Sequence, residues 1–432
     1  EWLTKIATLT PDNVAAFRHL AVLLTGGRVA VALVNSLGVV AAYFLVRRLW
    51  GRKAAVVAGL LLALDPFLVG LSGLLHVDGL SATFVILSLL MLSVGLTPGK
   101  ARERAWVWLA AAGALAGLAA LTKPHTLLWL RWRNDGRPPT ARAAALLRDG
   151  IVWGAAFMAV ILVLFPALWV SPSAVLAMIG GSANRHLEEA LRETFFLGRV
   201  AFDHGPLFYP IALLWRLSPI VWLALFPMAA LLIERLKDGR VTVPDIYPVL
   251  LLLLWAVLFL MAITPAAKKF DRYILPVVPA LLVVAAVAWA KWAGRDWQIG
   301  RRVLALAILG HVIYWLVYAA YPLAAYNPLV GGSRTAVAVL PVGWGESIGA
   351  AGRWLTRTQP AAESERAIAG IVPALAPFFA GTSLVDGLDD PASADYTIVT
   401  LGGHQLNPAG WNDQIHGRDM IYVVRFGGLD PA

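Results

Sequence analysis

The sequence predicts an all-α polytopic membrane protein that carries a small α/β extracytoplasmic domain at its C-terminal end. Of the 432 residues, 59% are hydrophobic and only 14% are charged, whereas a soluble domain would carry about 25% charged residues. Nine long apolar segments approach the length needed to cross a bilayer, roughly 17–25 residues. Because the chain contains no cysteine, disulfides and thiol chemistry are excluded.

The predicted spans follow one another between residues 28 and 320. They lie at 28–46, 54–75, 80–96, 105–121, 151–170, 213–233, 247–263, 273–290 and 303–320. Asp65-Pro66 interrupts the second span, and we expect a kink or helix end there because proline lacks a backbone donor and restricts the preceding residue. Residues 1–27 are amphipathic and mixed, and we expect them to end a first extracytoplasmic loop that follows a helix preceding Glu1.

Lysine and arginine are distributed unequally between alternate loops. One set of loops holds 19 of these cations and the other holds 9. The positive-inside rule places the richer set in the cytoplasm. The richer set comprises 47–53, 98–105, 131–150, 234–240 and 291–302; the poorer set comprises 1–27, 71–79, 122–126, 171–212 and 264–272. The short stretch 124–130 reaches only about 10 Å as a helix, so 105–130 is expected to be a re-entrant hairpin unless residues are missing there.

The chain changes character after the last span. Acidic residues become frequent beyond 321, and strand-like runs occur at 396–401 and 421–426 between breaks rich in proline and glycine. We therefore divide the chain into 1–27, a membrane domain at 28–320 with the outside loop 171–212, and an extracytoplasmic domain at 321–432.

His76 and Asp78 lie at the turn between the second and third predicted spans. Ionisable residues at membrane depth or at its edge are costly and usually functional. A carboxylate there can accept a proton from an attacking hydroxyl or amine, or can position an acceptor or a metal ion. Asp78 can equally be the N-cap of the 80–96 helix, and the two roles are compatible.

Lys268, Lys269 and Arg272 crowd one outside loop, against the orientation rule. Their clustering predicts an anionic partner such as a lipid-linked phosphate, because fixed cations stabilise negative charge that develops on a leaving group. Contact with anionic lipid headgroups and pairing with Asp271 are the alternatives. Lys123, at the outer end of a span, can reach a phosphate or snorkel to the interface.

The remaining candidates lie in loops. The stretch Asn184 to Arg199 resembles an amphipathic helix on the membrane surface. His204 and Tyr209 can bind an acceptor, although a lone loop histidine is more often structural. Glu346 can lie beside the active site or in a turn that leads into the tail domain. No spacing of histidine, aspartate and glutamate resembles a preformed zinc site, so no metal ligand is predicted.

Several short motifs, in their order and spacing, resemble bacterial glycosyltransferases of the GT-C fold. The motifs are Ala63-Leu-Asp-Pro-Phe67, the Leu-His-Val-Asp turn, Leu121-Thr-Lys-Pro124, Arg272-Tyr-Ile-Leu-Pro276, Asn327-Pro-Leu-Val-Gly-Gly332 and Gly343-Trp-Gly-Glu346. The resemblance is to the protein O-mannosyltransferase and aminoarabinose-transferase superfamily, and it covers nearly the whole chain. It implies transfer of a sugar from a polyprenyl-phosphate donor to a lipid, glycan or protein acceptor, on the outer face of a bacterial plasma membrane.

The resemblance also suggests roles for individual residues. Asp78 matches the acidic residue that precedes the fourth family helix, Lys123 matches the Thr-Lys motif, and Lys268, Lys269 and Arg272 match the basic loop near the donor phosphate. Two departures stand out. The family's principal catalytic carboxylate precedes the first residue of this chain, so the fragment is expected to be inactive without it. Gly73 stands where relatives often carry arginine.

The predicted function is therefore that of a membrane glycosyltransferase. The reaction allows assistance by a divalent metal ion, and no nucleic-acid partner is expected. The alternative is a polytopic transporter or lipid flippase, which would show inverted repeats and charges near the membrane midplane. A non-catalytic scaffold that presents the tail domain is a further alternative. Here the charges lie at helix ends, which favours the enzyme.

Overall fold

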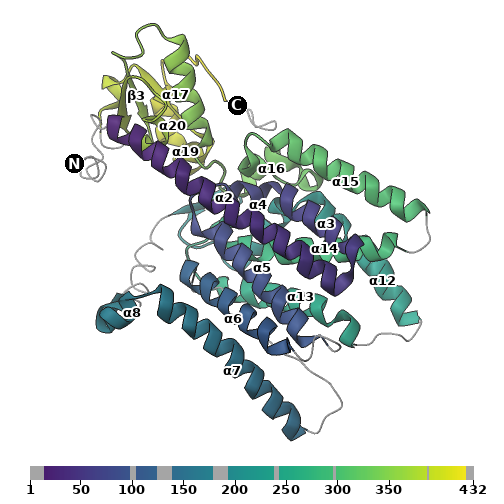
Figure 1. Ribbon diagram of the computed structural model, residues 1–432. Coiled ribbons are helices and arrows are strands. Elements are labelled where there is room, and N and C mark those ends of the chain that lie inside the picture. The colour runs from purple at the N-terminus through teal and green to yellow at the C-terminus, as the bar shows by residue number, and fades with distance from the viewer. Residues whose placement is uncertain are drawn as a thin grey trace. The chain divides into compact units, whose positions relative to one another are not determined.

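The computed structural model describes residues 14–97, 104–123, 139–178, 193–237, 243–294, 298–386 and 389–424. Most of them are helical, as Figure 1 shows. The chain divides into two compact units. The α/β unit comprises Glu1–Ala30, Glu193–Asp203 and Tyr318–Ala432; the membrane unit comprises Val31–Arg192 and His204–Val317.

Helices make up the membrane unit. They are α2 (Val14–Trp50, which begins in the other unit), α3 (Arg52–Leu64), α4 (Pro66–Ser72), α5 (Val77–Leu96), α6 (Ala105–Thr122), α7 (Pro139–Leu164), α8 (Ala167–Val170), α10 (Phe208–Arg216), α11 (Pro219–Leu223), α12 (Leu225–Lys237), α13 (Val243–Ile263), the 3-10 helix η3 (Asp271–Val277), α14 (Val278–Ala293) and α15 (Gln298–Tyr318). Within the described residues, seven helices are long and apolar enough to cross a membrane, or up to nine spans if each bent pair counts as one. The predicted fold class is confirmed.

The core of the membrane unit is built around α14 and α5. The span Asp271–Ala293 is 89% buried and Val77–Leu96 is 72% buried, whereas Ala144–Leu164 is only 6% buried. Close approach of α6 to α7 depends on Gly113, where an added Cβ would lie 2.1 Å from the backbone oxygen of Trp153. Small residues allow such close contact between membrane helices, where van der Waals packing drives association.

Two spans are broken. α3 and α4 meet at 59°, which confirms the kink predicted at Asp65-Pro66. Asp65 caps α4, because its Oδ1 accepts from Leu68 N at 2.9 Å and its Oδ2 accepts from Ser218 Oγ at 2.5 Å. The span predicted at 213–233 is instead a pair of helical segments bent by 102°. Pro219 begins the second segment, where its fixed φ and missing N–H suit a helix start and prevent continuation of α10.

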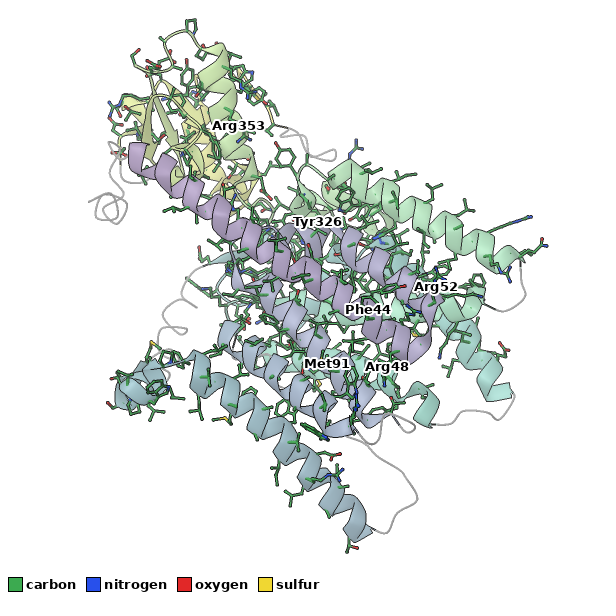
Figure 2. The ribbon with its side chains drawn as sticks, viewed as in Figure 1. Phe44, Arg48, Arg52, Met91, Tyr326 and Arg353 are labelled. Carbon is green, nitrogen blue, oxygen red and sulfur yellow. The ribbon has the colours of Figure 1, made fainter. Side chains whose placement is uncertain are left out.

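The first predicted span also differs in its limits. α2 begins at Val14 rather than near residue 28, and it ends in a basic turn before α3. Arg48 and Arg52 lie on the two sides of this turn (Figure 2). Gly51 between them has a φ of 86°. Residues with a Cβ rarely adopt such a value, so glycine suits this position. The loop of highest cation density is therefore a tight, fixed turn.

The α/β unit contains two small sheets. The strands β1 (Thr194–Phe196) and β2 (Arg199–Ala201) form an antiparallel hairpin, and β3 (Arg366–Ala369), β4 (Thr382–Val385) and β5 (Tyr396–Ile398) form a parallel sheet of order β4-β3-β5. The helices are α16 (Gly332–Val339), α17 (Glu346–Thr358), α18 (Val372–Leu375), α19 (Leu401–Leu406) and α20 (Pro408–Ile415). Ile348, Leu355, Ala367 and Phe379 form its apolar core.

Two local predictions fail in this unit. The amphipathic helix predicted from Asn184 to Arg199 is contradicted in its second half, because 194–201 is the β1–β2 hairpin. Leu197 and Gly198 turn the chain with φ values of 50° and 74°, as a tight hairpin requires. The first half of that prediction lies outside the described residues. The strand predicted at 421–426 is not formed over 421–424, whereas the run at 396–401 contains β5.

Candidate active site

Asp78 lies in the first turn of α5 and is completely buried. The helix begins at Val77, so the N-cap is His76, whose Nδ1 accepts from Asp78 N at 3.3 Å. The capping role predicted as an alternative for Asp78 is therefore wrong, because the neighbouring imidazole fills it. This arrangement leaves the Asp78 carboxylate to face other elements of the bundle.

Three nitrogen groups surround that carboxylate. Lys123 Nζ lies 2.5 Å from Oδ1, His76 Nδ1 lies 3.1 Å from Oδ2, and Arg272 Nε lies 3.9 Å from Oδ2. Lys123 is the C-cap of α6 and Arg272 lies in η3. The fold thus brings together four residues that the sequence analysis had selected from three separate segments. Such charges interact strongly because the surrounding protein has a low dielectric constant.

His76 can stabilise the carboxylate only in one protonation pattern. Without a proton, Nδ1 accepts from Asp78 N, as in the N-cap; with a proton, Nδ1 instead donates to Asp78 Oδ2 at 3.1 Å, so the two contacts exclude each other. The same proton fixes the tautomer of a neutral imidazole, so that Nε2 becomes the acceptor nitrogen. The side chain of His76 is 37% exposed, whereas that of Asp78 is fully buried. The pair therefore joins an interior carboxylate to a more accessible imidazole.

Aromatic rings line the cationic side of the cluster. Lys123 Nζ lies 4.4 Å from the centroid of the Tyr273 ring, and Arg272 Cζ lies 5.6 Å from the same centroid and 5.0 Å from that of Phe270. Such placements favour cations electrostatically. Burial lowers the pKa of Lys123; the carboxylate of Asp78 opposes this effect, and Arg272 adds to it. The local environment therefore holds two cations close together.

A buried ion pair fixes the loop that carries Arg272. Asp271 Oδ2 accepts from Arg216 Nε at 2.6 Å, and its Oδ1 accepts from Arg272 N at 2.8 Å. Neither side chain of the pair is more than 3% exposed, and the Arg216 guanidinium also lies over the ring of Phe67. Asp271 therefore takes its ionic partner from α10, rather than from the loop cations that the sequence analysis had considered.

Arg216 and Asp65 were missed as parts of this region. Arg216 lies inside a predicted apolar span, and a charge at such a position is itself a signal of function or of a buried partner. Asp65 was identified only as the place of a kink, yet it is fully buried and bonded to Ser218. The charge inside an apolar span and the aspartate at the kink are both visible in the sequence. Their partners, Asp271 and Ser218, are not.

The other predicted residues are distributed unevenly. Lys268 Nζ lies 5.9 Å from the Phe270 ring, and Lys269 is buried with its Nζ donating to Ala266 O at 2.6 Å. Tyr209 is buried on α10, which packs against η3; its hydroxyl has no hydrogen-bond partner within the described part of the chain. Tyr209 thus belongs beside the cluster.

His204 and Glu346 are placed differently. His204 precedes α10 and its ring stacks at 6.0 Å on that of Phe208. Glu346 belongs to the α/β unit, where its Oε2 accepts from Trp344 N at 2.8 Å at the start of α17. The contact lies inside the α/β unit, at the turn that precedes α17. The stretch 124–131, whose topology was left open, lies outside the described residues.

The Asp78 cluster does not fit a metal ion. Its only carboxylate already faces Lys123 and Arg272, and a divalent cation would be repelled by both. Among the described residues, no group of three or more metal-binding side chains occurs. A divalent metal ion thus stays an expectation of the sequence analysis that these residues do not support.

The bundle of apolar helices defines an integral membrane protein. Residues 16–130 match the family model described as dolichyl-phosphate-mannose-protein mannosyltransferase. Undecaprenyl phosphate-alpha-4-amino-4-deoxy-L-arabinose arabinosyl transferase 2 of Pseudomonas fluorescens is 27% identical over 74% of this chain and 53% of its own length. The arabinosyl transferase of the same description from Pseudomonas aeruginosa is 26% identical over 74% of this chain and 62% of its own length.

The chain thus spans between 53% and 62% of the length of these relatives. A crystal structure of ArnT from Cupriavidus metallidurans bound to undecaprenyl phosphate is 18% identical, with a TM-score of 0.46, over 86% of this chain and 75% of that one. The sequence similarities confirm the resemblance first seen in the motifs. The chain is similar in sequence to membrane glycosyltransferases of the mannosyltransferase and aminoarabinose-transferase type.

Proposed function

We propose that this chain is a membrane glycosyltransferase that moves a sugar from a polyprenyl-phosphate donor to an acceptor on the extracytoplasmic face. The observation that carries the proposal is the convergence of Lys123 and Arg272 on the buried carboxylate of Asp78. The relatives support it, because their names describe transfer of 4-amino-4-deoxy-L-arabinose carried on undecaprenyl phosphate. Those names speak against the transporter or flippase alternative.

The cations suit the departing lipid phosphate. An acceptor hydroxyl or amine attacks the anomeric carbon, the bond from that carbon to the phosphate oxygen breaks, and negative charge grows on the lipid phosphate. Lys123 and Arg272, with Lys268 and Lys269 on the same loop as Arg272, stabilise this charge where it develops. The proximity of Tyr209 adds a buried hydroxyl that can donate to a phosphate oxygen.

Asp78 acts in this proposal as a positioning residue. Its carboxylate is held by Lys123 and His76, so taking a proton from the acceptor would first require an ion pair to break. When Nδ1 carries a proton and donates to Asp78 Oδ2 in place of its N-cap contact, His76 presents Nε2 as the group that accepts the proton of the attacking nucleophile. An aspartate that orients a histidine in this way is a recurring arrangement in enzymes.

The sidedness rests on the distribution of cations. The loop between α2 and α3 is strongly basic, and the positive-inside rule places it in the cytoplasm. The next turn, which carries His76 and Asp78, then lies on the opposite face. We place the cluster, and the transfer reaction with it, at the extracytoplasmic surface of a bacterial plasma membrane.

Binding of the lipid phosphate tests the cationic site. The purified chain in nanodiscs is titrated with undecaprenyl phosphate, and Arg272→Gln is expected to weaken binding by about tenfold, the loss of one charge-assisted contact. Arg48→Gln is the matched control, because Arg48 lies over Trp108 at the α2–α3 turn and has no role in the proposed site. Equal affinity for wild type and Arg272→Gln would overturn the assignment.

Transfer itself is measured with labelled donors. Proteoliposomes that contain the chain with its expected N-terminal segment restored receive undecaprenyl-phosphate aminoarabinose or undecaprenyl-phosphate mannose, and label in acceptor lipid or peptide is counted. Transfer is expected to fall strongly in Asp78→Asn and in the double variant Lys268→Ala/Lys269→Ala. Undiminished turnover in both would sink the site assignment, and label that crosses the bilayer without being transferred would favour the flippase.

A further inference from the structure

The parallel sheet of the α/β unit has a topology that creates a binding crevice. β3 is central, β4 pairs on one side of it and β5 on the other, all in parallel register. The chain therefore leaves the carboxyl end of β3 toward one side and returns from β4 to the other side. In open parallel sheets, ligands bind outside the carboxyl ends of the strands at such a reversal.

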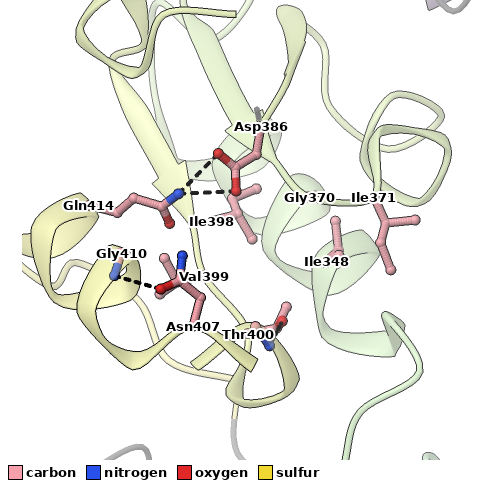
Figure 3. A pocket seen from close by; sticks show the side chains of 11 residues that line it. Ile348, Gly370, Ile371, Asp386, Ile398, Val399, Thr400, Asn407, Gly410 and Gln414 are labelled. Carbon is pink, nitrogen blue, oxygen red and sulfur yellow. Dashed lines mark hydrogen bonds between the residues drawn. The ribbon is translucent and has the colours of Figure 1, made fainter. Parts of the chain in front are cut away.

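A pocket of about 110 Å³ lies at this edge (Figure 3). Its wall includes residues that directly follow each strand: Gly370 after β3, Asp386 after β4, and Val399 with Thr400 after β5. Apolar side chains from the sheet and neighbouring helices supply the rest of the wall. These are Ile348, Ile371, Ile398 and Val399.

The polar groups of the pocket are held in place by hydrogen bonds. Gln414 Nε2 donates to both carboxylate oxygens of Asp386 at 3.0 Å, and Asn407 Oδ1 accepts from Gly410 N at 3.0 Å (Figure 3). Thr400 Oγ accepts a backbone N–H at the start of α19. Each bond fixes one end of its side chain, so the Gln414 carbonyl oxygen, the Asn407 carboxamide N–H groups and the Thr400 hydroxyl proton can still bond to a ligand.

The composition of the pocket selects the class of ligand. Its eleven described lining residues include one carboxylate and no lysine, arginine or histidine, so a phosphate or another anion would find no cation there. A carboxylate, two carboxamides and a hydroxyl beside aliphatic side chains match a ring that carries several hydroxyl groups, or an amino group in their place. Saccharides have these properties.

We propose that this pocket is a saccharide-binding site for a neutral or amino sugar, distinct from the Asp78 cluster of the membrane unit. The inference goes beyond the proposed transfer reaction and does not depend on it. A site of this kind would hold part of a glycan while chemistry takes place elsewhere on the chain. Binding of sugar alone, in the absence of any lipid donor, therefore tests it separately.

Gly370 offers a direct way to block the pocket. An added Cβ there would meet no heavy atom within 4 Å, and its φ lies outside the left-handed region. Gly370→Leu therefore fills the open space without straining the backbone, and Gly370→Ala is its conservative partner. Asp386→Ala removes the carboxylate by an independent change, and Asp390→Asn is a control at an exposed carboxylate that caps a turn elsewhere in the unit.

The experiment is saturation-transfer NMR on the whole chain in nanodiscs. The probes are methyl mannoside, methyl glucosaminide and methyl 4-amino-4-deoxyarabinoside, with inorganic phosphate as competitor. At least one sugar is expected to give a signal that phosphate leaves unchanged. Gly370→Leu and Asp386→Ala are each expected to weaken binding by about tenfold, while Gly370→Ala, Asp390→Asn and Arg272→Gln retain it.

Three results would overturn the proposal. They are the absence of a signal for every sugar with the wild-type chain, a signal that phosphate displaces, and a signal that survives both Gly370→Leu and Asp386→Ala. Loss of the signal in Arg272→Gln would place the bound sugar at the Asp78 cluster instead. Circular dichroism and limited proteolysis monitor folding, and Gln414→Leu replaces any variant that does not fold.

Discussion

Removing one partner of the buried Arg216–Asp271 ion pair is expected to destabilise the membrane unit strongly. The perturbation is Asp271→Asn, which keeps the size of the side chain but takes away its charge. The Arg216 guanidinium would then keep its position on α10, where it is 0% exposed, with the charge of Asp271 taken away. The carboxamide also weakens the bond that fixes the backbone N–H of Arg272.

The magnitude follows from burial. Breaking a buried pair by removing one member costs about 3–5 kcal/mol of folding free energy, because the remaining charge cannot reach water. Exposed pairs cost only about 0–1 kcal/mol, and with side-chain exposures of 0% and 3% this pair belongs to the first class. The double variant Arg216→Met/Asp271→Asn removes both charges and is expected to cost less than Asp271→Asn alone.

The assay is reversible unfolding in mixed micelles, from which the free energy of unfolding is obtained for the wild type, both single variants and the double variant. Arg216→Met is expected to cost about as much as Asp271→Asn, so the cycle should show a large coupling energy. A cost below about 1 kcal/mol for Asp271→Asn would refute the reasoning. So would a double variant whose cost equals the sum of the two single ones.

Two further predictions concern the cluster and the helix packing. Lys123→Met should destabilise the unit by about 3–5 kcal/mol in the same assay, because it leaves Asp78 fully buried beside one cation fewer; a change below about 1 kcal/mol would show that the carboxylate is not held by Lys123. Gly113→Ala should cost about 1–3 kcal/mol, since its Cβ would meet the backbone of Trp153, whereas Gly154→Ala on α7, where nothing lies within 4 Å, should be neutral or slightly stabilising. Equal stabilities for the two alanine variants would contradict the close approach of α6 and α7.

Much of the helical architecture was predictable because it depends on local properties. Apolar length identified the spans, and Asp65-Pro66 identified the first bend, since a proline acts on its own turn. The break before Pro219 was missed, although it has the same cause. The helix limits were less accurate, as at Val14, because an amphipathic turn can extend a helix without being apolar throughout. Residues 194–199 were predicted to belong to a helix, although two residues with positive φ make a hairpin there.

The candidate site was predictable as a set of residues but not as an arrangement. Ionisable side chains at the ends of apolar segments drew attention to His76, Asp78, Lys123 and Arg272, because charge is costly near a membrane. Which of them meet depends on the packing of α5, α6 and η3, which no local pattern encodes. Asp78 is not the N-cap because α5 begins at Val77, one residue before it. The N-cap is therefore His76.

The sequence by itself determined that this chain is a polytopic membrane protein, since apolar length and the scarcity of charge follow directly from composition. It also supplied the motifs that relate the chain to membrane glycosyltransferases. Only the tertiary structure decided that Asp271 pairs with Arg216, that Asp78 is held between Lys123 and Arg272, and that three parallel strands end at one pocket. Hydrophobicity acts on each segment separately, whereas the partner of a buried charge is chosen by which segments pack together.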